Sequence, residues 1–209
     1  MRGKNIAISG LTAAGKTTHA KILAAELEYS YVSATEIMAD MLGINRCEVG
    51  PGFWQKYGDS IAKVRDTTDL DRELDNRLTA MATGDEGLVI DAWALPWLVP
   101  RGSCISIWIE SDHHSRTLKA AVSDDNKQEL SWYGPFIARK DDDTRERFLK
   151  IYGFDLYAAR DNFSLEIDNS AYITRATRED SDQGIRAFAP VVNSSVAKLL
   201  VSDNANRTL

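Results

Sequence analysis

Gly10-Leu11-Thr12-Ala13-Ala14-Gly15-Lys16-Thr17 is a complete G-x-x-x-x-G-K-[ST] motif, and it decides the fold class of this chain. Residues 4–9 before it form a short apolar, strand-like run. Residues 17–28 after it carry apolar side chains at helical spacing. Glycines in such a strand–loop–helix turn let backbone amides point inward at phosphate oxygens, next to the partial positive charge of the helix start. The motif therefore predicts a site for a nucleoside triphosphate.

The last two residues of the motif have predicted chemical roles. We expect Lys16 to reach the β- and γ-phosphates and Thr17 to supply a hydroxyl to Mg²⁺. The residues expected to bind ATP are Gly10, Thr12, Ala13, Ala14, Gly15, Lys16, Thr17 and Thr18. The alternative is a strand-to-helix turn that binds nothing.

The composition is that of an ordinary globular protein, with 44% apolar and 27% charged side chains among 209 residues. The formal net charge of −6 argues against nucleic acid or an anionic membrane as the partner, because both favour a basic face. We expect no membrane span, no signal peptide and a cytoplasmic location. Cys47 and Cys104 are expected to be reduced thiols, and the histidines form no ligand set.

The order of expected elements indicates an α/β fold. Strands are expected at 4–9, 31–33, 88–91, 103–109 and 163–167. Helices are expected at 15–28, 35–42, 54–65, 69–83, 113–122, 130–147, 147–152 and 178–201, the last one kinked or split by Pro190, with an irregular stretch at 43–53. Strands alternating with helices predict a single P-loop NTPase-type domain over 1–209, a three-layer sandwich with a five-stranded parallel sheet. Ligands of such sheets bind beyond the carboxyl ends of the strands.

Further segments resemble those of one family. They are 6–10 with 15–18, 31–37, 70–77, 147–155 and 164–170. In order and spacing they resemble the cytidylate (CMP/dCMP) kinases, in particular their short archaeal-type branch. The resemblance implies a nucleoside monophosphate kinase-like fold, an acceptor-binding helical region at about 35–83 and a mobile basic lid at about 123–147. It also implies that the turn at Asn169 and Ser170 approaches the adenine.

The chain departs from this family at two acceptor-facing arginines. Ala39 stands at the place of the first arginine, and Trp93 at the place of the second. Bidentate guanidinium contacts are a strong way to hold a phosphate dianion. Either other cations hold the acceptor phosphate, or the acceptor is not an ordinary nucleoside monophosphate. The candidate cations are Arg46, Lys56, Lys63, Arg65 and Arg72.

A basic set near the C-terminal third is the candidate lid, because phosphoryl transfer needs positive charge around the moving group. Its members are Arg139, Lys140, Arg145 and Arg147. The alternative is an exposed helix with ion pairs at i,i+4 spacing to Asp141, Asp142, Asp143 and Glu146. The acid of the family's D-x-x-R pair falls on Asp142 or on Thr144, depending on register.

Other residues have both a functional and a structural interpretation. Asp91 ends a buried strand near the loop, where it could hold a Mg²⁺ water or orient the acceptor, or cap the next turn. Ser33 resembles a residue near the pyrimidine ring, or caps a helix. Trp93 and Trp97 could stack on a base or pack on the core. The set Asp71, Asp75, Arg72 and Arg77 forms an acceptor-facing helix surface or a solvated one; Arg72 and Asp142 are included among the substrate-binding candidates.

We therefore expect an enzyme that moves the γ-phosphoryl group of ATP, with Mg²⁺, to CMP, dCMP or a modified pyrimidine nucleotide. One alternative is transfer to a hydroxyl of another small metabolite, with Asp91 as general base. Another is an NTP-dependent regulatory module with little transferase activity. The expected partner is a small-molecule acceptor, and the expected assembly is a monomer or homodimer.

Overall fold

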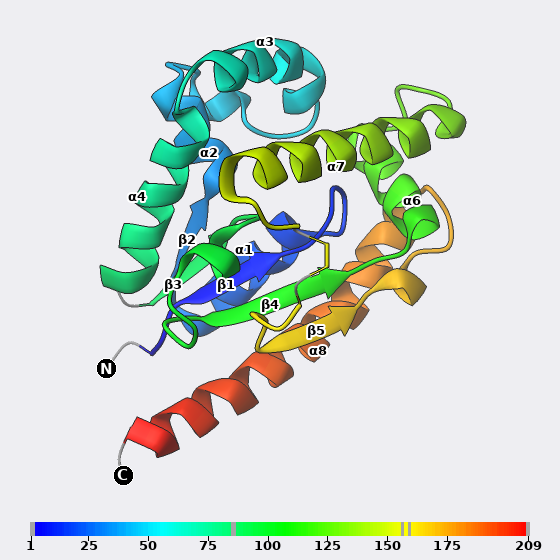
Figure 1. Cartoon of the computed structure of the whole chain (residues 1–209). Coiled ribbons are helices and arrows are strands. Elements are labelled where there is room, and N and C mark those ends of the chain that lie inside the picture. The colour runs from blue at the N-terminus through cyan, green and yellow to red at the C-terminus, as the bar shows by residue number, and fades with distance from the viewer. Residues whose placement is uncertain (1–2, 85–86, 156, 159, 208–209) are drawn as a thin grey trace.

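The computed structural model describes residues 3–84, 87–155, 157–158 and 160–207, with side chains described up to residue 203. Across these residues the strands form one parallel sheet in the order β2-β3-β1-β4-β5 (Figure 1). The strands are β1 Ile6–Ser9, β2 Ser30–Ser33, β3 Leu88–Asp91, β4 Ile105–Glu110 and β5 Leu165–Asp168. The predicted parallel sheet is confirmed.

Helices lie on both faces of this sheet. They are α1 Lys16–Leu27, α2 Ala34–Met41, α3 Phe53–Thr67, α4 Leu70–Gly84, α5 Leu95–Leu98, α6 His113–Ser123, α7 Leu130–Tyr152 and α8 Arg178–Arg207. The short 3-10 turns are η1 Arg46–Glu48 and η2 Ser170–Tyr172. Helix α7 crosses above the sheet, between α3 and the strands (Figure 1).

Side chains that alternate along the strands contribute to two hydrophobic clusters, one on each face of the sheet. Ala7 and Ile90 face a cluster built from α2, α3, α4 and α5. Ile6 and Ile8 face a second cluster, to which α1 contributes Leu23 and α8 contributes further apolar side chains. Successive side chains of a strand point to opposite faces, so the strands pack against the helices of both layers. This is the predicted three-layer α/β arrangement.

Several elements differ from the expectation. The region expected as two helices is the single helix α7, which ends at Gly153 in the left-handed conformation with φ 73°. Helix α8 continues through Pro190 and is not split. Its Phe188, Val192 and Val196 pack into the core, and this tertiary packing outweighs the hydrogen bond that proline removes. Helix α5 and both 3-10 turns were not expected.

Helix α8 is also the segment to compare with the expectation of no membrane span. By length and composition alone, its segment Arg178–Asp203 is long and apolar enough to cross a membrane, with a mean hydropathy of 1.2 over its most apolar stretch. It is the one helix of the described residues that passes this test. A core helix passes the same test, and Phe188, Val192 and Val196 of α8 pack in the core, so this finding does not contradict the expectation of no membrane span.

Candidate active site

The phosphate-binding loop is shaped by residues in unusual backbone conformations. Gly10 has φ 152°, and a Cβ placed there would lie 2.5 Å from the carbonyl oxygen of Ile109. Ala13 and Gly15 lie in the left-handed region, with φ 61° and 92°. A turn with left-handed residues of this kind makes a concave array of backbone amides that binds anions. The sequence-predicted loop is thus a cradle ahead of α1.

Lys16 lies folded back over this loop. Its Nζ donates a hydrogen bond to the carbonyl oxygen of Leu11 at 2.8 Å and lies 5.0 Å from the centroid of the Trp93 ring. The side chain is buried, and burial lowers the pKa of the Lys16 ammonium. A desolvated cation next to a ring of amides has a strong interaction with a phosphate oxygen.

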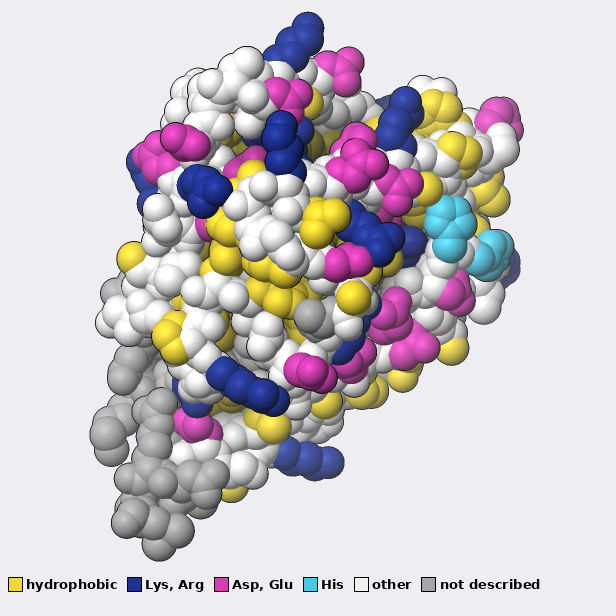
Figure 2. Space-filling view, viewed as in Figure 1, with side chains coloured by type: hydrophobic (Ala, Val, Ile, Leu, Met, Phe, Trp, Pro, Cys, Tyr) yellow, Lys and Arg dark blue, Asp and Glu magenta, His cyan; other side chains and the backbone are white. Residues whose placement is uncertain are grey.

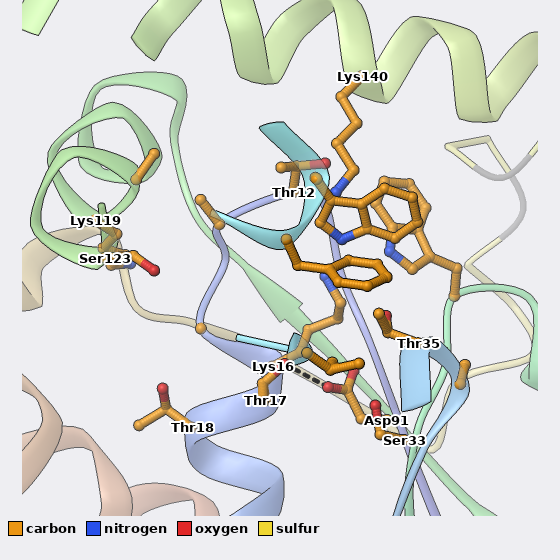
Figure 3. Close-up of a pocket in the computed structure, with 18 of the residues that line it drawn as sticks. Thr12, Lys16, Thr17, Thr18, Ser33, Thr35, Asp91, Lys119, Ser123 and Lys140 are labelled. Atoms are coloured by element: carbon orange, nitrogen blue, oxygen red, sulfur yellow. Dashed lines mark hydrogen bonds between the residues drawn. The ribbon is translucent and has the colours of Figure 1, made fainter. Parts of the chain in front are cut away.

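Thr17, in the first turn of α1, and Asp91, the last residue of β3, form a hydrogen-bonded pair at the carboxyl ends of the strands. Thr17 Oγ1 donates to Asp91 Oδ2 at 2.5 Å, as the dashed line in Figure 3 shows. The hydroxyl of Tyr31 lies 3.4 Å from the same oxygen. Strand pairing produces this proximity, because Asp91 stands opposite Ile8, just before the loop.

This pair fits Mg²⁺. Among the described residues no group of three or more His, Cys, Asp or Glu side chains could hold a metal ion. Mg²⁺ does not need such a group, since it keeps several waters and takes one or two protein oxygens together with substrate phosphates. A threonine hydroxyl and a carboxylate next to a phosphate cradle are that kind of donor set.

A cavity of about 550 Å³ surrounds the loop and extends to both sides of it. Lys140 reaches into it from α7, and Figure 3 shows the side chain pointing from that helix toward the loop. Its ammonium lies 3.9 Å from the centroid of the Trp54 ring. Burial, reinforced by the charge of Lys16, lowers the pKa of Lys140 well below its usual value. The described residues give this ammonium no hydrogen-bonded carboxylate.

Arg65 is the second cation on this side of the cavity. Its Nε donates to the carboxylate oxygens of Asp71 at 2.9 and 3.1 Å, and both side chains are largely buried. Its charge also acts on Lys140. The remaining candidate cations lie outside this cavity. Arg46 and Lys56 are exposed and form ion pairs with Asp40 and Glu48, respectively. Lys63 is exposed, and Arg72 lines a second hollow of about 160 Å³.

Arg116 and Asp141 hold the loop from α6 and α7, and sequence reasoning missed both roles. Asp141 accepts a hydrogen bond from the backbone amide of Thr12 at 2.9 Å. Arg116 pairs with the same carboxylate and donates to the carbonyl oxygen of Thr12 at 3.1 Å. Both side chains are buried, at 6% and 4% exposure. No local pattern signals this pair, because Asp141 stands in a run of acids that resembles a solvated face.

On the other side of the loop, Asn169 links several elements. Its Nδ2 donates to the carbonyl oxygen of Ala14 at 2.8 Å, and its Oδ1 accepts from Lys119 at 2.6 Å. Burial lowers the pKa of Lys119 to about 8 and that of the neighbouring His19 to about 4. This end of the cavity is completed by Tyr172, Ile173, Ile185 and Phe188.

Residues 5–171 match the model of the cytidylate kinase-like family. The chain belongs to this family. It is 27% identical to the cytidylate kinase of Sulfurisphaera tokodaii over 154 residues, which is 72% of this chain and 78% of that protein. It is 25% identical to the cytidylate kinase of Natronomonas pharaonis over 188 residues, covering 88% of this chain and 91% of that protein. The predicted family and its archaeal-type character are confirmed.

A solved structure supports the fold of this cytidylate kinase-like chain. It is an uncharacterized protein from Eubacterium ventriosum, with a TM-score of 0.56 at 14% sequence identity, and the match covers 91% of this chain and 99% of that one. At this identity the likeness concerns the fold alone. The likeness supports the predicted α/β fold, and the family match confirms the predicted kinase class.

The residues that the family resemblance relates to the acceptor differ in whether they line the cavity. Ala39 is completely buried in the α2–α4 cluster and does not line the cavity. Trp93 does line the cavity, whereas Trp97 stacks on Phe154 at a centroid distance of 5.8 Å. Ser33 lines the cavity and also caps α2, accepting a hydrogen bond from the Glu36 amide at 3.3 Å.

The arginines of the candidate lid do not reach the loop in this structure. Arg145 pairs with Asp155, and Arg147 lies 2.7 Å from a carboxylate oxygen of Asp66. Arg139 and Asp142 are exposed and do not line the cavity, and Arg72 donates to the carbonyl oxygen of Ile151 at 2.8 Å. Figure 2 shows acidic and basic side chains intermingled over α3 and α7. The roles assigned to these residues stay predictions.

Proposed function

We propose that the protein transfers the γ-phosphoryl group of ATP to the phosphate of a pyrimidine nucleoside monophosphate, CMP or dCMP. The observation that carries this proposal is the arrangement of Lys16, Lys140 and Arg65 around one cavity, beside the Thr17–Asp91 pair. Two phosphate groups need such a concentration of positive charge in order to approach each other. The names of the family and of its similar members supply the acceptor class.

The donor nucleotide fits the loop and the cavity end beyond it. The loop amides and Lys16 would hold the β- and γ-phosphates of ATP, and the adenine would lie between His19 and the apolar side chains of η2 and α8. Thr17 and Asp91 would hold Mg²⁺, which neutralises phosphate charge when it is bound. The hydrogen bond between them already places both oxygens at the cradle.

The acceptor fits the opposite end. Arg65 and Lys140 would bind its phosphate, in place of the arginines that this chain lacks at residues 39 and 93. Its ring would lie among apolar side chains that line the cavity there: Met38, Phe53, Trp54, Leu74 and Leu78. Apolar walls with a few polar groups are typical of small-molecule sites.

The reaction needs little covalent help from the protein. An oxygen of the acceptor phosphate attacks the γ-phosphorus while the bond to the leaving β-phosphate oxygen breaks, which yields ADP and a nucleoside diphosphate. No general base is required, because that oxygen is already ionised. Asp91 is therefore free to remain bonded to Thr17 at the metal position. Closure of α7 would bring Arg145 and Arg147 nearer to the transferring group, as the sequence predicts.

One observation favours a second candidate, transfer to the hydroxyl of a metabolite. An aromatic ring, Trp93, lines the cavity where the family carries an arginine. This acceptor would need a base, and Asp91 is the carboxylate next to the loop. We place the activity in the cytoplasm, which agrees with the free thiols of Cys47 and Cys104.

The test is a radiolabelled γ-phosphoryl transfer assay with Mg²⁺ and a panel of acceptors: CMP, dCMP, UMP, AMP, cytidine and no acceptor. Transfer to CMP or dCMP is the expected result. Transfer only to cytidine or another neutral hydroxyl would support the second candidate. Hydrolysis of ATP without transfer would contradict both and indicate a regulatory nucleotide-binding module.

A further inference from the structure

Asp75 is a buried carboxyl of the cavity wall that phosphate transfer does not use. It lies on α4, is 7% exposed and lines the cavity. Its Oδ2 accepts a hydrogen bond from the hydroxyl of Tyr152 at 2.7 Å. Asp71, one turn earlier, is neutralised by Arg65, whereas Asp75 has no cation at hydrogen-bond distance among the described residues. Burial of an unpaired acid is costly, which makes Asp75 a candidate for a role in binding.

The position of Asp75 relates it to the acceptor. Asp71 and Asp75 are four residues apart, so they lie on one face of α4, about 6 Å from each other along the helix axis. Arg65, the proposed phosphate ligand, contacts the first of them. Leu74 and Leu78 of the same helix line the cavity beside the second. A nucleotide whose phosphate binds Arg65 would extend along α4 and place its base near Asp75.

The hydrogen bond from Tyr152 fixes what Asp75 can recognise. The phenol hydroxyl donates to Oδ2, and no described residue donates to Oδ1. In the ionised form this second oxygen only accepts hydrogen bonds. The 4-position distinguishes the two common pyrimidines, because cytosine carries an amino donor there and uracil carries a carbonyl acceptor. A carboxylate oxygen would bind the first and repel the second.

We propose that Asp75 is a specificity-determining residue that binds the exocyclic amino group of the acceptor base and selects cytosine over uracil. This inference rests on the proposed function, since it assumes a pyrimidine nucleotide on the α4 side of the cavity. Tyr152 is a positioning residue, which holds the carboxylate through Oδ2 and leaves the other oxygen for the base. A site that must pair each buried polar group discriminates strongly against a base of the wrong polarity.

The experiment compares kcat/KM for CMP and UMP in the wild type and in Asp75→Asn. The asparagine can accept from Tyr152 through its carbonyl oxygen and then presents an N–H donor, which suits the 4-carbonyl of uracil and opposes the amino group of cytosine. We expect the ratio of kcat/KM for CMP over UMP to fall at least tenfold, with the value for UMP rising. Kd values for both nucleotides, from calorimetry, should shift in the same sense.

Glu73→Gln is the matched control, because Glu73 lies on the exposed face of the same helix and pairs with Arg77. Its CMP-to-UMP ratio should equal that of the wild type. If Asp75→Asn does not fold, Tyr152→Phe takes its place, with a fall in the ratio of at least threefold expected.

The outcomes separate this inference from the proposed function. A wild type that phosphorylates CMP, combined with an unchanged CMP-to-UMP ratio in the folded variant, would overturn the role of Asp75 alone. A wild type that phosphorylates neither pyrimidine nucleotide would overturn the proposed function itself.

Discussion

The carboxylate of Asp141 accepts a hydrogen bond from the backbone amide of Thr12 at 2.9 Å, which joins helix α7 directly to the phosphate-binding loop. The same carboxylate is paired with the buried guanidinium of Arg116. Helix α7, which carries the candidate lid residues, is therefore held to the loop by Asp141. The cation that it extends into the cavity is a different residue, Lys140. The backbone of the loop and the position of α7 are linked through this contact.

Asp141→Ala should destabilise the fold, because it leaves the Arg116 charge buried without its partner. Removing one member of a buried ion pair costs about 3–5 kcal/mol. The free energy of unfolding, measured by urea titration, should fall by that amount. Asp143→Ala, at an exposed position of the same helix, should change it by less than about 0.5 kcal/mol. Equal losses in the two variants would contradict the anchoring role.

Lys16→Ala should remove most of the transferase activity without unfolding the protein. Loss of one charged donor to the transferring phosphoryl group lowers kcat by about 10²–10³-fold. Turnover with saturating ATP and CMP measures this effect, and circular dichroism checks the fold. Lys198→Ala, at an exposed position of α8, is the control. Near-normal turnover of Lys16→Ala would mean that ATP does not bind this loop.

Arg65→Gln should weaken binding of the acceptor and not that of ATP. Hydrogen bonds to charged groups contribute about 1.5–3 kcal/mol, so the KM for CMP should rise by about 10–100-fold. The KM for ATP should change less than threefold. Arg46→Gln, which removes an exposed arginine paired with Asp40, should affect neither constant. If Arg65→Gln raises only the KM for ATP, the two ends of the cavity are assigned the wrong way round.

Asp75 should also make stability depend on pH. Burial raises its pKa from an ordinary value of 3.8 to about 6. Between these values the folded chain retains a proton that the unfolded chain has lost, so stability falls as the pH rises through this interval. Asp75→Asn lacks this proton. Its free energy of unfolding relative to the wild type should therefore increase by roughly 2–3 kcal/mol from pH 4 to pH 7.

Urea unfolding at several pH values tests this difference, with Glu73→Gln as the control that should follow the wild type. Parallel stability curves of Asp75→Asn and the wild type would show that the carboxyl is ionised normally in the folded chain.

Ala39→Arg, which would restore the arginine of the family, should unfold the protein rather than improve acceptor binding. Ala39 is fully buried against the α2–α4 cluster, so an arginine there overfills the core and buries a charge without a partner. We expect a loss of roughly 3 kcal/mol or more in the free energy of unfolding. Ala25→Arg, at an exposed position of α1, is the control. A stable Ala39→Arg protein with a lower KM for CMP would contradict this expectation.

The loop and its surroundings could be predicted because their signals are local. The motif from Gly10 to Thr17 marks one turn, and the parallel sheet that the strand–helix order predicts brings the ends of β1 and β3 together. That is why the proximity of Asp91 to the loop could be foreseen, although its hydrogen bond to Thr17 could not.

Burial of polar side chains was much harder to foresee. Asp71 and Asp75, for which a solvated face was one interpretation, are buried because α3 and α7 cover that side of α4 with Arg65 and Tyr152. Their partners lie six or more residues away in the sequence, beyond the reach of helical periodicity. The buried position of Ala39 shows the same limit, since a family register does not reveal which side of α2 faces the core.

Gly184 of α8 lies so close to η2 that a Cβ there would be 1.8 Å from the carbonyl oxygen of Tyr172. The part of the cavity proposed for the purine of the donor is therefore walled by a helix that begins beyond residue 171, where the family match ends. Substitutions on this outer helix would therefore change the preference among ATP, GTP and other triphosphates without altering the side chains that line the acceptor end of the cavity. Selectivity for the two substrates can thus diverge independently during evolution.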